Sequence, residues 1–193
     1  MSVKEQDEYS RKKEGWDQDA DMLTDYFERG MLLDATKADT DNDGVVDGND
    51  RNPRCAPSKE KTEAQGIAQF LFYLYTRRGS ARSGPFPFTA WIVSTVDDYD
   101  GKGRPSTFDG LELTGVDGIV LHMSPDDVKR YRSIHGYGTP IINIHEATST
   151  GQSLREFHFS EYIAPEGAVG WRIRVKRVNG IWLPVEWEMT WIS

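Results

Sequence analysis

The stretch Asp39–Asp50, DTDNDGVVDGND, decides how the N-terminal part of this chain folds. It holds five aspartates in twelve positions, and three of them alternate with other residues just before Gly44. Carboxylates packed this closely repel one another, so the stretch by itself is typical of a solvated acidic loop or a disordered linker. A bound hard cation would remove the repulsion, and the spacing of the acids distinguishes these interpretations.

The spacing fits a calcium-binding loop of twelve residues. In such a loop, oxygen ligands come from positions 1, 3, 5, 7, 9 and 12, and a glycine at position 6 allows a sharp turn. With Asp39 at position 1, Gly44 falls at position 6, where a residue without Cβ is favoured. The backbone carbonyl is the ligand at position 7. The candidate ligands are therefore Asp39, Asp41, Asp43, Val45, Asp47 and Asp50.

The same template fits residues 16–28, WDQDADMLTDYFE, upstream. Met22 stands where the glycine is expected, and a positive φ at a non-glycine residue is uncommon and strained. We therefore expect weaker calcium binding or a different turn in this loop. The alternative is a helix N-terminus with acids in its first turn, beginning near Asp25. The candidate ligands of this loop are Asp17, Asp19, Asp21, Leu23, Asp25 and Glu28.

Tandem acidic loops joined by a short helical turn resemble bacterial thrombospondin type 3 repeats. The resemblance rests on D-x-D-x-D-x-x-x-D-x-x-E at 17–28, DATKADTDNDGVVDGND at 34–50 and NPRC at 52–55, so it covers residues 17–57 only. It implies calcium ions bound in series, little hydrophobic core, and an extracellular, cell-surface or periplasmic location. Dockerin-type and EF-hand loops are the nearest alternatives, and they use similar ligand positions.

Charge divides the chain at the same point. Residues 1–57 carry a net charge of −7 and residues 58–193 a net charge of −1. The acidity therefore belongs to the loops, and the chain lacks the basic footprint that phosphate binding requires, which argues against a nucleic-acid partner. We expect a disordered lead at 1–14, tandem calcium-binding loops at 15–57 and an α+β domain of unknown function at 58–193.

Two further signals concern the compartment. No apolar run approaches the length of a membrane span, and the single cysteine, Cys55, excludes a disulfide within the chain. The opening MSVKEQDEYSRKKEG has no apolar core of a signal peptide. An exported protein whose signal has been removed and a cytoplasmic protein both remain open.

The second part of the chain predicts an α+β fold, with a helix packed on a mostly antiparallel sheet. IAQFLFYLYTRRG, residues 67–79, has one apolar stripe of helical period, and Thr62 with Gln65 forms a capping box before it. SPDDVKRYRSIHG, residues 124–136, predicts a second helix capped by Ser124. The predicted strands are TAWIVSTV, GIVLHM, PIINIHEA, LREFHFSEYI, VGWRIRVKRV and IWLPVEWEMTWI.

The last two strands predict a hairpin around Asn179-Gly180. A two-residue turn would place Ile173 opposite Glu186 and so mix apolar and polar faces. We therefore expect a three-residue loop that includes Val178, which places Ile173 opposite Val185. Pro184 predicts a bulge or an edge position.

Two functions of different classes follow. The first is a calcium-dependent module in which the ions rigidify the loops, which position or attach an α+β binding domain for a protein or cell-surface glycan partner. Trp91 and Trp182 are the exposed candidates for stacking on a sugar. The alternative is a hydrolase-like enzyme with a histidine site on the sheet, although the sequence predicts no catalytic residue and contains no nucleophile elbow or phosphate loop. The histidines are His122, His135, His145 and His158.

Overall fold

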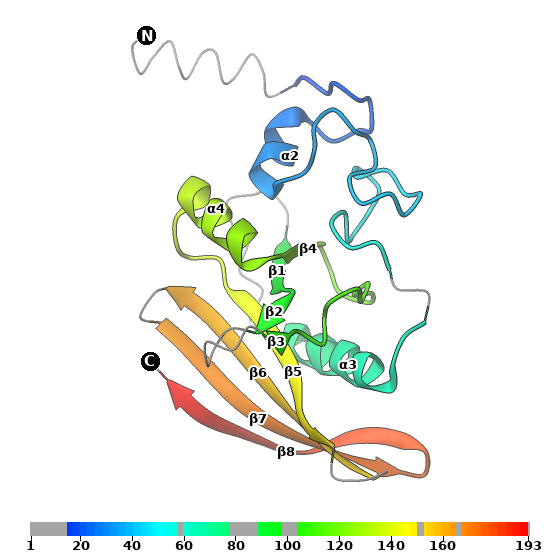
Figure 1. The fold of residues 1–193 in the computed structure, drawn as a ribbon, viewed down its shortest axis with the longest axis vertical. Helices are drawn as coiled ribbons and strands as arrows, with labels where there is room; N and C mark the ends of the chain where they lie inside the picture. The colour runs from blue at the N-terminus through cyan, green and yellow to red at the C-terminus, as the bar shows by residue number, and fades with distance from the viewer. Residues whose placement is uncertain are drawn as a thin grey trace.

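The computed structural model describes residues 15–57, 60–77, 89–97, 104–149, 153–164 and 167–192 (Figure 1). The predicted lead, residues 1–14, lies outside these ranges. The helices are α2 (Asp25–Met31), α3 (Glu63–Arg77) and α4 (Pro125–His135). The strands are β1 (Ala90–Ser94), β2 (Val96–Asp97), β3 (Arg104–Pro105), β4 (Ile119–Met123), β5 (Ile141–Ser149), β6 (Leu154–Ala164), β7 (Gly167–Val178) and β8 (Ile181–Ile192).

The main sheet has six strands in the order β4-β1-β5-β6-β7-β8. Strands β4, β1 and β5 run parallel, whereas β5 to β8 form an antiparallel meander of long strands. The predicted α+β class is confirmed, with a mixed sheet whose antiparallel half is the larger. In the acidic segment, residues 15–57, the described chain forms one short helix, α2, and is otherwise turns and loops (Figure 1).

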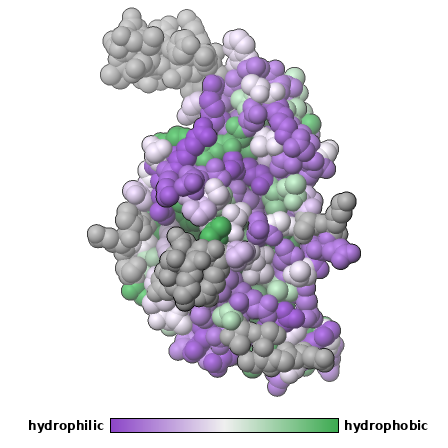
Figure 2. Space-filling view, viewed as in Figure 1, coloured by the Kyte–Doolittle hydropathy of each residue, from purple (hydrophilic) through white to green (hydrophobic). Residues whose placement is uncertain are grey.

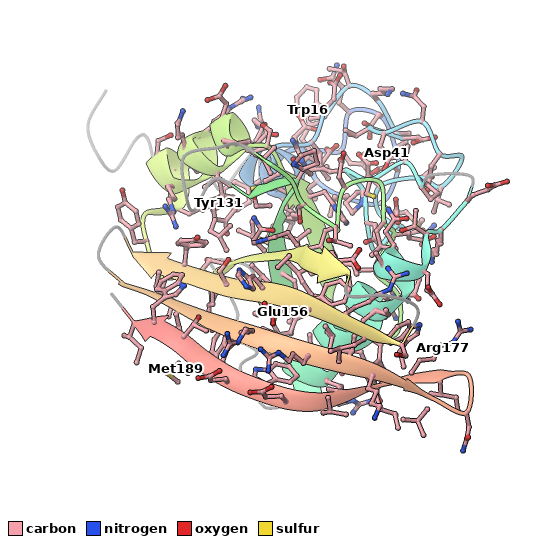
Figure 3. All side chains as sticks on the ribbon, turned by 60° about the horizontal axis from the view of Figure 1, so that its bottom comes forward. Trp16, Asp41, Tyr131, Glu156, Arg177 and Met189 are labelled. Carbon is pink, nitrogen blue, oxygen red and sulfur yellow. The ribbon has the colours of Figure 1, made fainter. Side chains whose placement is uncertain are left out.

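Helices cover both faces of the sheet. Trp91 and Val93 of β1 pack in a core with α3, whereas Ala90 and Ile92 pack with Tyr131 of α4. Because alternate residues of a strand point to opposite faces, α3 and α4 lie on opposite sides of the sheet. Figure 3 shows Tyr131, 1% exposed, between α4 and the strands.

Both predicted helix starts are present. The Ser124 side chain accepts a hydrogen bond from the Asp127 amide, and the Asp127 carboxylate accepts one from the Ser124 amide. The Thr62 hydroxyl likewise accepts from the Gln65 amide at 3.1 Å, and Gln65 Oε1 accepts from the Thr62 amide at 2.9 Å. These reciprocal contacts satisfy amide groups that the first turn of a helix leaves unpaired.

The acidic segment packs directly against the α+β domain. Met31, Leu32 and Leu33 lie in the same buried cluster as Leu121 and Met123 of β4. Figure 2 shows hydrophobic side chains gathered between α2 and α4, with hydrophilic side chains around them. Burial of shared apolar surface is the main favourable term in such an interface, so the segment and the domain stabilise each other.

Polar contacts add to this interface. The Val120 amide on the edge strand β4 donates to the Arg51 carbonyl at 2.6 Å. Asn52, 1% exposed, donates from Nδ2 to the Leu113 carbonyl at 3.3 Å and accepts from the Leu113 amide at 3.0 Å. The acidic segment thereby pairs with a backbone group on the outer side of β4, the strand at the edge of the sheet.

The predicted three-residue hairpin loop is wrong, whereas the bulge or edge position predicted from Pro184 is confirmed. Val178 pairs with Ile181 across a two-residue turn, in which Asn179 and Gly180 have φ values of 51° and 83°. The register shifts by one residue beside Pro184, on the edge strand β8.

The bulge beside Pro184 explains why the shorter turn is compatible with the pattern of faces. It moves the pairing so that Ile173 lies opposite Trp187 and Arg174 opposite Glu186. Beyond the bulge, apolar residues therefore pair with apolar residues and Arg174 pairs with Glu186, although the turn has only two residues. A two-residue turn mixes the faces only if the residues of the two strands pair one to one along the whole hairpin. A bulge breaks this one-to-one pairing.

Candidate metal centre

The two acidic loops hold their first aspartates in the same way. Asp17 Oδ2 accepts a hydrogen bond from the Met22 amide, and Asp39 Oδ2 accepts one from the Gly44 amide, each at 3.0 Å. In both loops this bond joins position 1 to position 6 of the template. The same spacing of residues therefore produces the same local closure of the chain.

The backbone angles agree as well. At position 4, Ala20 and Asn42 have φ values of 60° and 64°. At position 6, Met22 and Gly44 have φ values of 80° and 99°. Met22 thus adopts the left-handed turn that the template assigns to glycine, at the cost that such a φ imposes on a residue with a Cβ.

In the second loop, Asp39, Asp41 and Asp43 bring carboxylate oxygens within 4.8 Å of one another. The position-12 residue, Asp50, interacts with this group through its charge. Burial raises the pKa of Asp50 to about 6, and the negative charges of Asp43 and Asp41 also raise it. One oxygen of Asp41 and one of Asp50 are buried without a hydrogen-bond partner in the described structure. These oxygens are available to a cation.

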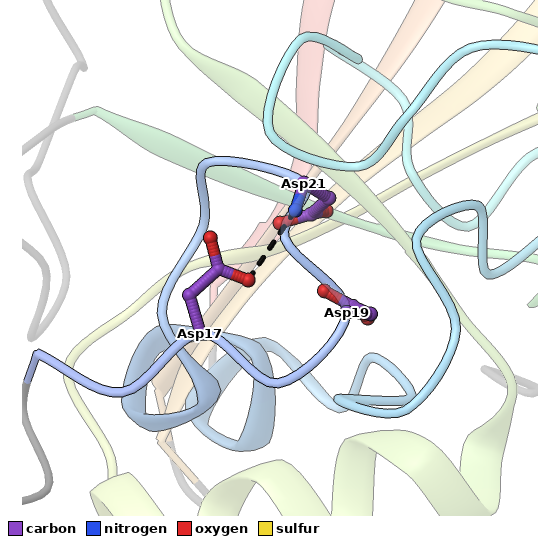
Figure 4. A group of neighbouring side chains, drawn as sticks. All are labelled: Asp17, Asp19 and Asp21. Carbon is purple, nitrogen blue, oxygen red and sulfur yellow. Dashed lines mark hydrogen bonds between the residues drawn. The ribbon is translucent and has the colours of Figure 1, made fainter.

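In the first loop, Asp17, Asp19 and Asp21 form the corresponding group, with oxygens within 4.8 Å of one another. Figure 4 shows the three side chains along one turn of the loop, with the Asp21 amide bonded to Asp17. Both oxygens of Asp19 are buried and have no partner within the described residues. Burial and the charge of Asp21 raise the pKa of Asp19.

A third group of carboxylates joins the two loops. Asp21 and Glu28 of the first loop lie with Asp47 of the second, their oxygens within 4.8 Å, and these residues are 2%, 0% and 1% exposed. Thr40 orients Asp47, because its amide donates to Asp47 Oδ1 at 2.8 Å. The template placed Asp47 at position 9 of its own loop, but the fold brings it to the ligands of the other loop.

Glu28 is the most unusual member of this group. Its side chain is fully buried, and neither of its oxygens has a hydrogen-bond partner in the described structure. Burial, together with the charges of Asp19, Asp21 and other nearby aspartates, raises the pKa of Glu28 to about 8. A buried carboxylate among other carboxylates is costly unless a positive charge neutralises it.

The structure places the remaining predicted ligands in different surroundings. Asp25 accepts from the Gln18 amide at 2.9 Å and forms an ion pair with Arg29 at 3.6 Å, so its carboxylate already has partners outside the three groups. Leu23 and Val45, the two position-7 residues, donate their amides to Asp21 and Asp43 at 2.7 Å and 2.8 Å.

The donor set is made of oxygen atoms. The three groups consist of carboxylates, which suit calcium or magnesium better than the softer transition metals. Cys55 lies nearby in sequence, but it is 5% exposed, and burial raises the pKa of its thiol to about 12. It therefore stays protonated at neutral pH, which suits neither a thiolate ligand nor a nucleophile.

The histidines do not gather in one site. His122 is 4% exposed and lies with Nε2 3.3 Å from Asn52 Oδ1, and His135 lies with Nε2 2.8 Å from the Gly30 carbonyl. Both thus connect the α+β domain to the acidic segment, a structural role that the sequence did not reveal. The rings of His145 and His158 meet edge to face across β5 and β6, with their centroids 5.0 Å apart.

The aromatic candidates for a sugar platform are occupied by other contacts. Trp91, predicted to be exposed, is 5% exposed, and its indole donates to the Asp117 carbonyl at 2.9 Å, so that prediction is wrong. Trp182 donates to Glu63 at 2.9 Å, and the guanidinium groups of Arg155 and Arg177 lie 5.4 Å and 5.9 Å from its ring centre.

Comparisons with protein families, curated proteins and solved structures found no match to this chain. Within the described residues, no helix has the length and apolar character needed to cross a membrane.

The difference between Met22 and Gly44 gives a direct test of the loop geometry. We expect Met22→Gly to tighten calcium binding at the first loop about two- to five-fold, because glycine removes the cost of the left-handed φ but loses more entropy on ordering. Gly44→Ala should weaken the second loop by backbone strain alone, since an added Cβ meets nothing within 4 Å. Calcium titrations of the two variants check both directions.

Gly15→Ala is the matched control for these substitutions. An added Cβ at Gly15 also meets nothing within 4 Å, and no positive φ is required there. Its calcium affinity should equal that of the original chain. Equal affinities for Met22→Gly, Gly44→Ala and Gly15→Ala would show that the turn at position 6 does not limit binding.

Proposed function

We propose that the acidic segment binds calcium at two centres, and that the ions fix this segment against the α+β domain. The observation that carries the proposal is the buried group of Asp21, Glu28 and Asp47, in which Glu28 has no partner for either oxygen. A calcium ion supplies the missing charge and takes six to eight oxygen ligands at distances of about 2.3–2.6 Å.

The two centres have different compositions. The first takes carboxylates from both loops, and its candidate ligands are Asp17, Asp19, Asp21, Glu28 and Asp47. The second lies within one loop, and its candidate ligands are Asp39, Asp41, Asp43 and Asp50. The backbone carbonyls of Leu23 and Val45 remain the expected position-7 ligands. Magnesium fits less well, because it prefers near-ideal octahedral geometry and retains several waters.

Calcium at the first centre acts on the α+β domain through α2 and the chain that follows it. Arg54 lies at this junction: it donates to the Leu32 and His122 carbonyls and forms an ion pair with Asp127 of α4 at 2.8 Å. His135, in the last turn of α4, contacts Gly30 at the end of α2. Both ends of α4 are therefore held by the acidic segment.

This arrangement favours a structural or binding module over an enzyme. The ions order the acidic segment, the segment holds α4 and the edge strand β4, and the α+β domain presents its remaining surface to a partner. Free calcium near the millimolar range, as found outside cells, would keep extracellular modules of this kind loaded. The hydrolase-like alternative has less support, because the four histidines lie in three separate places.

A calorimetric calcium titration of chelator-treated protein tests the proposal. We expect two binding events, with magnesium giving much less heat. The double variant Asp41→Ala, Asp43→Ala should lose the event of the second centre and keep the first, because the first takes Asp47 and no other residue from that loop. Two unchanged events in the double variant, or no heat with the original chain at several millimolar calcium, would contradict the assignment.

A further inference from the structure

A second candidate site lies in the α+β domain, away from the acidic groups. A cavity of about 330 Å³ opens between α4 and the face of the sheet that α4 covers. Val128 of α4 and Ile141 of β5 contribute apolar surface, and Tyr162 of β6 adds an aromatic ring. The polar side chains that line the cavity include Arg132 of α4 and Asn143 of β5.

Asn143, which lines this cavity, has an unused acceptor. The residue is 2% exposed, and its Nδ2 donates to the Val96 carbonyl at 3.0 Å, which fixes the orientation of the amide. Its Oδ1 is buried and has no hydrogen-bond partner in the described structure. An unsatisfied buried acceptor is costly, so a ligand N–H at this point would be favoured.

Arg132 leaves an unused donor and a positive charge. Its guanidinium lies 5.1 Å from the centre of the Tyr137 ring, and its Nη2 atom is buried without a hydrogen-bond partner in the described part of the chain. Burial lowers the pKa of Arg132, because the charged form loses water. Carboxylates and phosphates both fit the planar fork of a guanidinium.

We propose that this cavity binds a small carboxylic acid with an N–H donor next to its carboxylate, as in α-amino acids and N-acyl amino acids. Arg132 pairs with the carboxylate, Asn143 Oδ1 accepts the N–H, and Val128 and Ile141 contact an apolar side chain. The inference rests on the cavity alone and does not depend on the calcium proposal.

The size and charge of the cavity restrict the ligand class. Its volume is at the lower end of the roughly 300–1,000 Å³ typical of small-molecule sites, which favours a molecule the size of one amino acid over a nucleotide or an oligosaccharide. Arg132 is the charged side chain among the described residues that line it. A single guanidinium balances a monoanionic carboxylate, whereas a phosphate dianion would require more positive charge.

Binding of defined probes to the full chain, saturated with calcium, tests this inference by amide-resolved NMR. We expect N-acetyl-L-leucine to shift the amide signals of Ser94, Val128 and Asn143. N-acetyl-L-leucinamide, which lacks the charge, and 4-methylpentanoate, which lacks the N–H, should each bind about ten-fold more weakly or worse. Comparison with L-leucine identifies whether the free or the acylated amino acid is preferred.

Variants assign the two contacts. Arg132→Gln should remove the preference for the carboxylate over the carboxamide, whereas Arg130→Gln, two residues away on the same helix, should keep it. The proposal is overturned by equal affinity for acid and amide in the original chain, by shifts outside the cavity, or by none at ten millimolar probe. A calcium titration of the same sample reports separately on the acidic centres, so failure of one proposal does not imply failure of the other.

Discussion

Replacing Glu28 by glutamine should stabilise the calcium-free protein and, in the same variant, remove most of the stabilisation that calcium provides. Without calcium, the raised pKa keeps Glu28 largely protonated at pH 7, and Glu28→Gln removes the free-energy cost of that protonation, a gain of about 1–3 kcal/mol in the free energy of unfolding. With calcium at about one hundred times its dissociation constant, the original chain gains ~2.7 kcal/mol by linkage. The variant forfeits much of that gain, because it lacks a charged ligand.

Thermal or denaturant unfolding in chelator and in several millimolar calcium measures both effects. The variant should be more stable than the original chain in chelator, and this advantage should shrink or disappear in calcium, because calcium stabilises the variant less. Asp126→Asn is the control: Asp126 is 91% exposed and pairs with Lys129 on the surface of α4, so neither condition should change its stability appreciably. If Glu28→Gln lowered stability equally in both conditions, Glu28 would be a packing residue and not a ligand.

Lowering the pH from 7 to 5 should reduce the free energy of unfolding by about 2 kcal/mol through His122 alone. Burial, with a contribution from the charge of Arg54, lowers the pKa of His122 to about 3, whereas an unfolded histidine titrates near 6.5. Below that value the unfolded chain binds a proton that the native chain does not bind. The stabilisation is therefore complete above pH 6.5 and is lost progressively as the pH falls toward 3.

The measurement is a comparison of the original chain with His122→Gln in saturating calcium. At pH 7.5 their difference reports the packing and the contact with Asn52 that the substitution changes. The further difference that appears between pH 7 and pH 5 belongs to the proton on His122. The buried acids Glu28 and Asp50 are present in both proteins, so their own pH dependence cancels in the comparison. Parallel losses of stability in the two proteins would show that His122 is not the source.

Some of the structural features discussed above could be predicted from the sequence alone. The spacing of the aspartates predicted the loop positions, and the structure gives both loops the same bond from position 1 to position 6. Ser124 and Thr62 predicted the starts of α4 and α3 for the same reason. Each of these features depends on residues three to five positions apart, which the local backbone brings together whatever the rest of the chain does.

The hairpin marks the limit of local reasoning. The sequence contains both the Asn179-Gly180 turn and Pro184, which indicates a bulge, and the register depends on the two together. In the structure the bulge corrects the register that the short turn imposes. A register is a property of the whole ladder, so one turn does not determine it.

By itself the sequence determined the tandem acidic loops, the helix caps and the α+β class, because these follow from short-range spacing and from periodicity. Only the tertiary structure decided that Asp47 joins Asp21 and Glu28, that Arg54 and His135 hold α4, and that Arg132 faces the same cavity as Asn143. Arg54 and His135 make these contacts only because the edge strand β4 and helix α4 dock against the acidic segment. That docking depends on the shape of a shared apolar core, which no local pattern specifies.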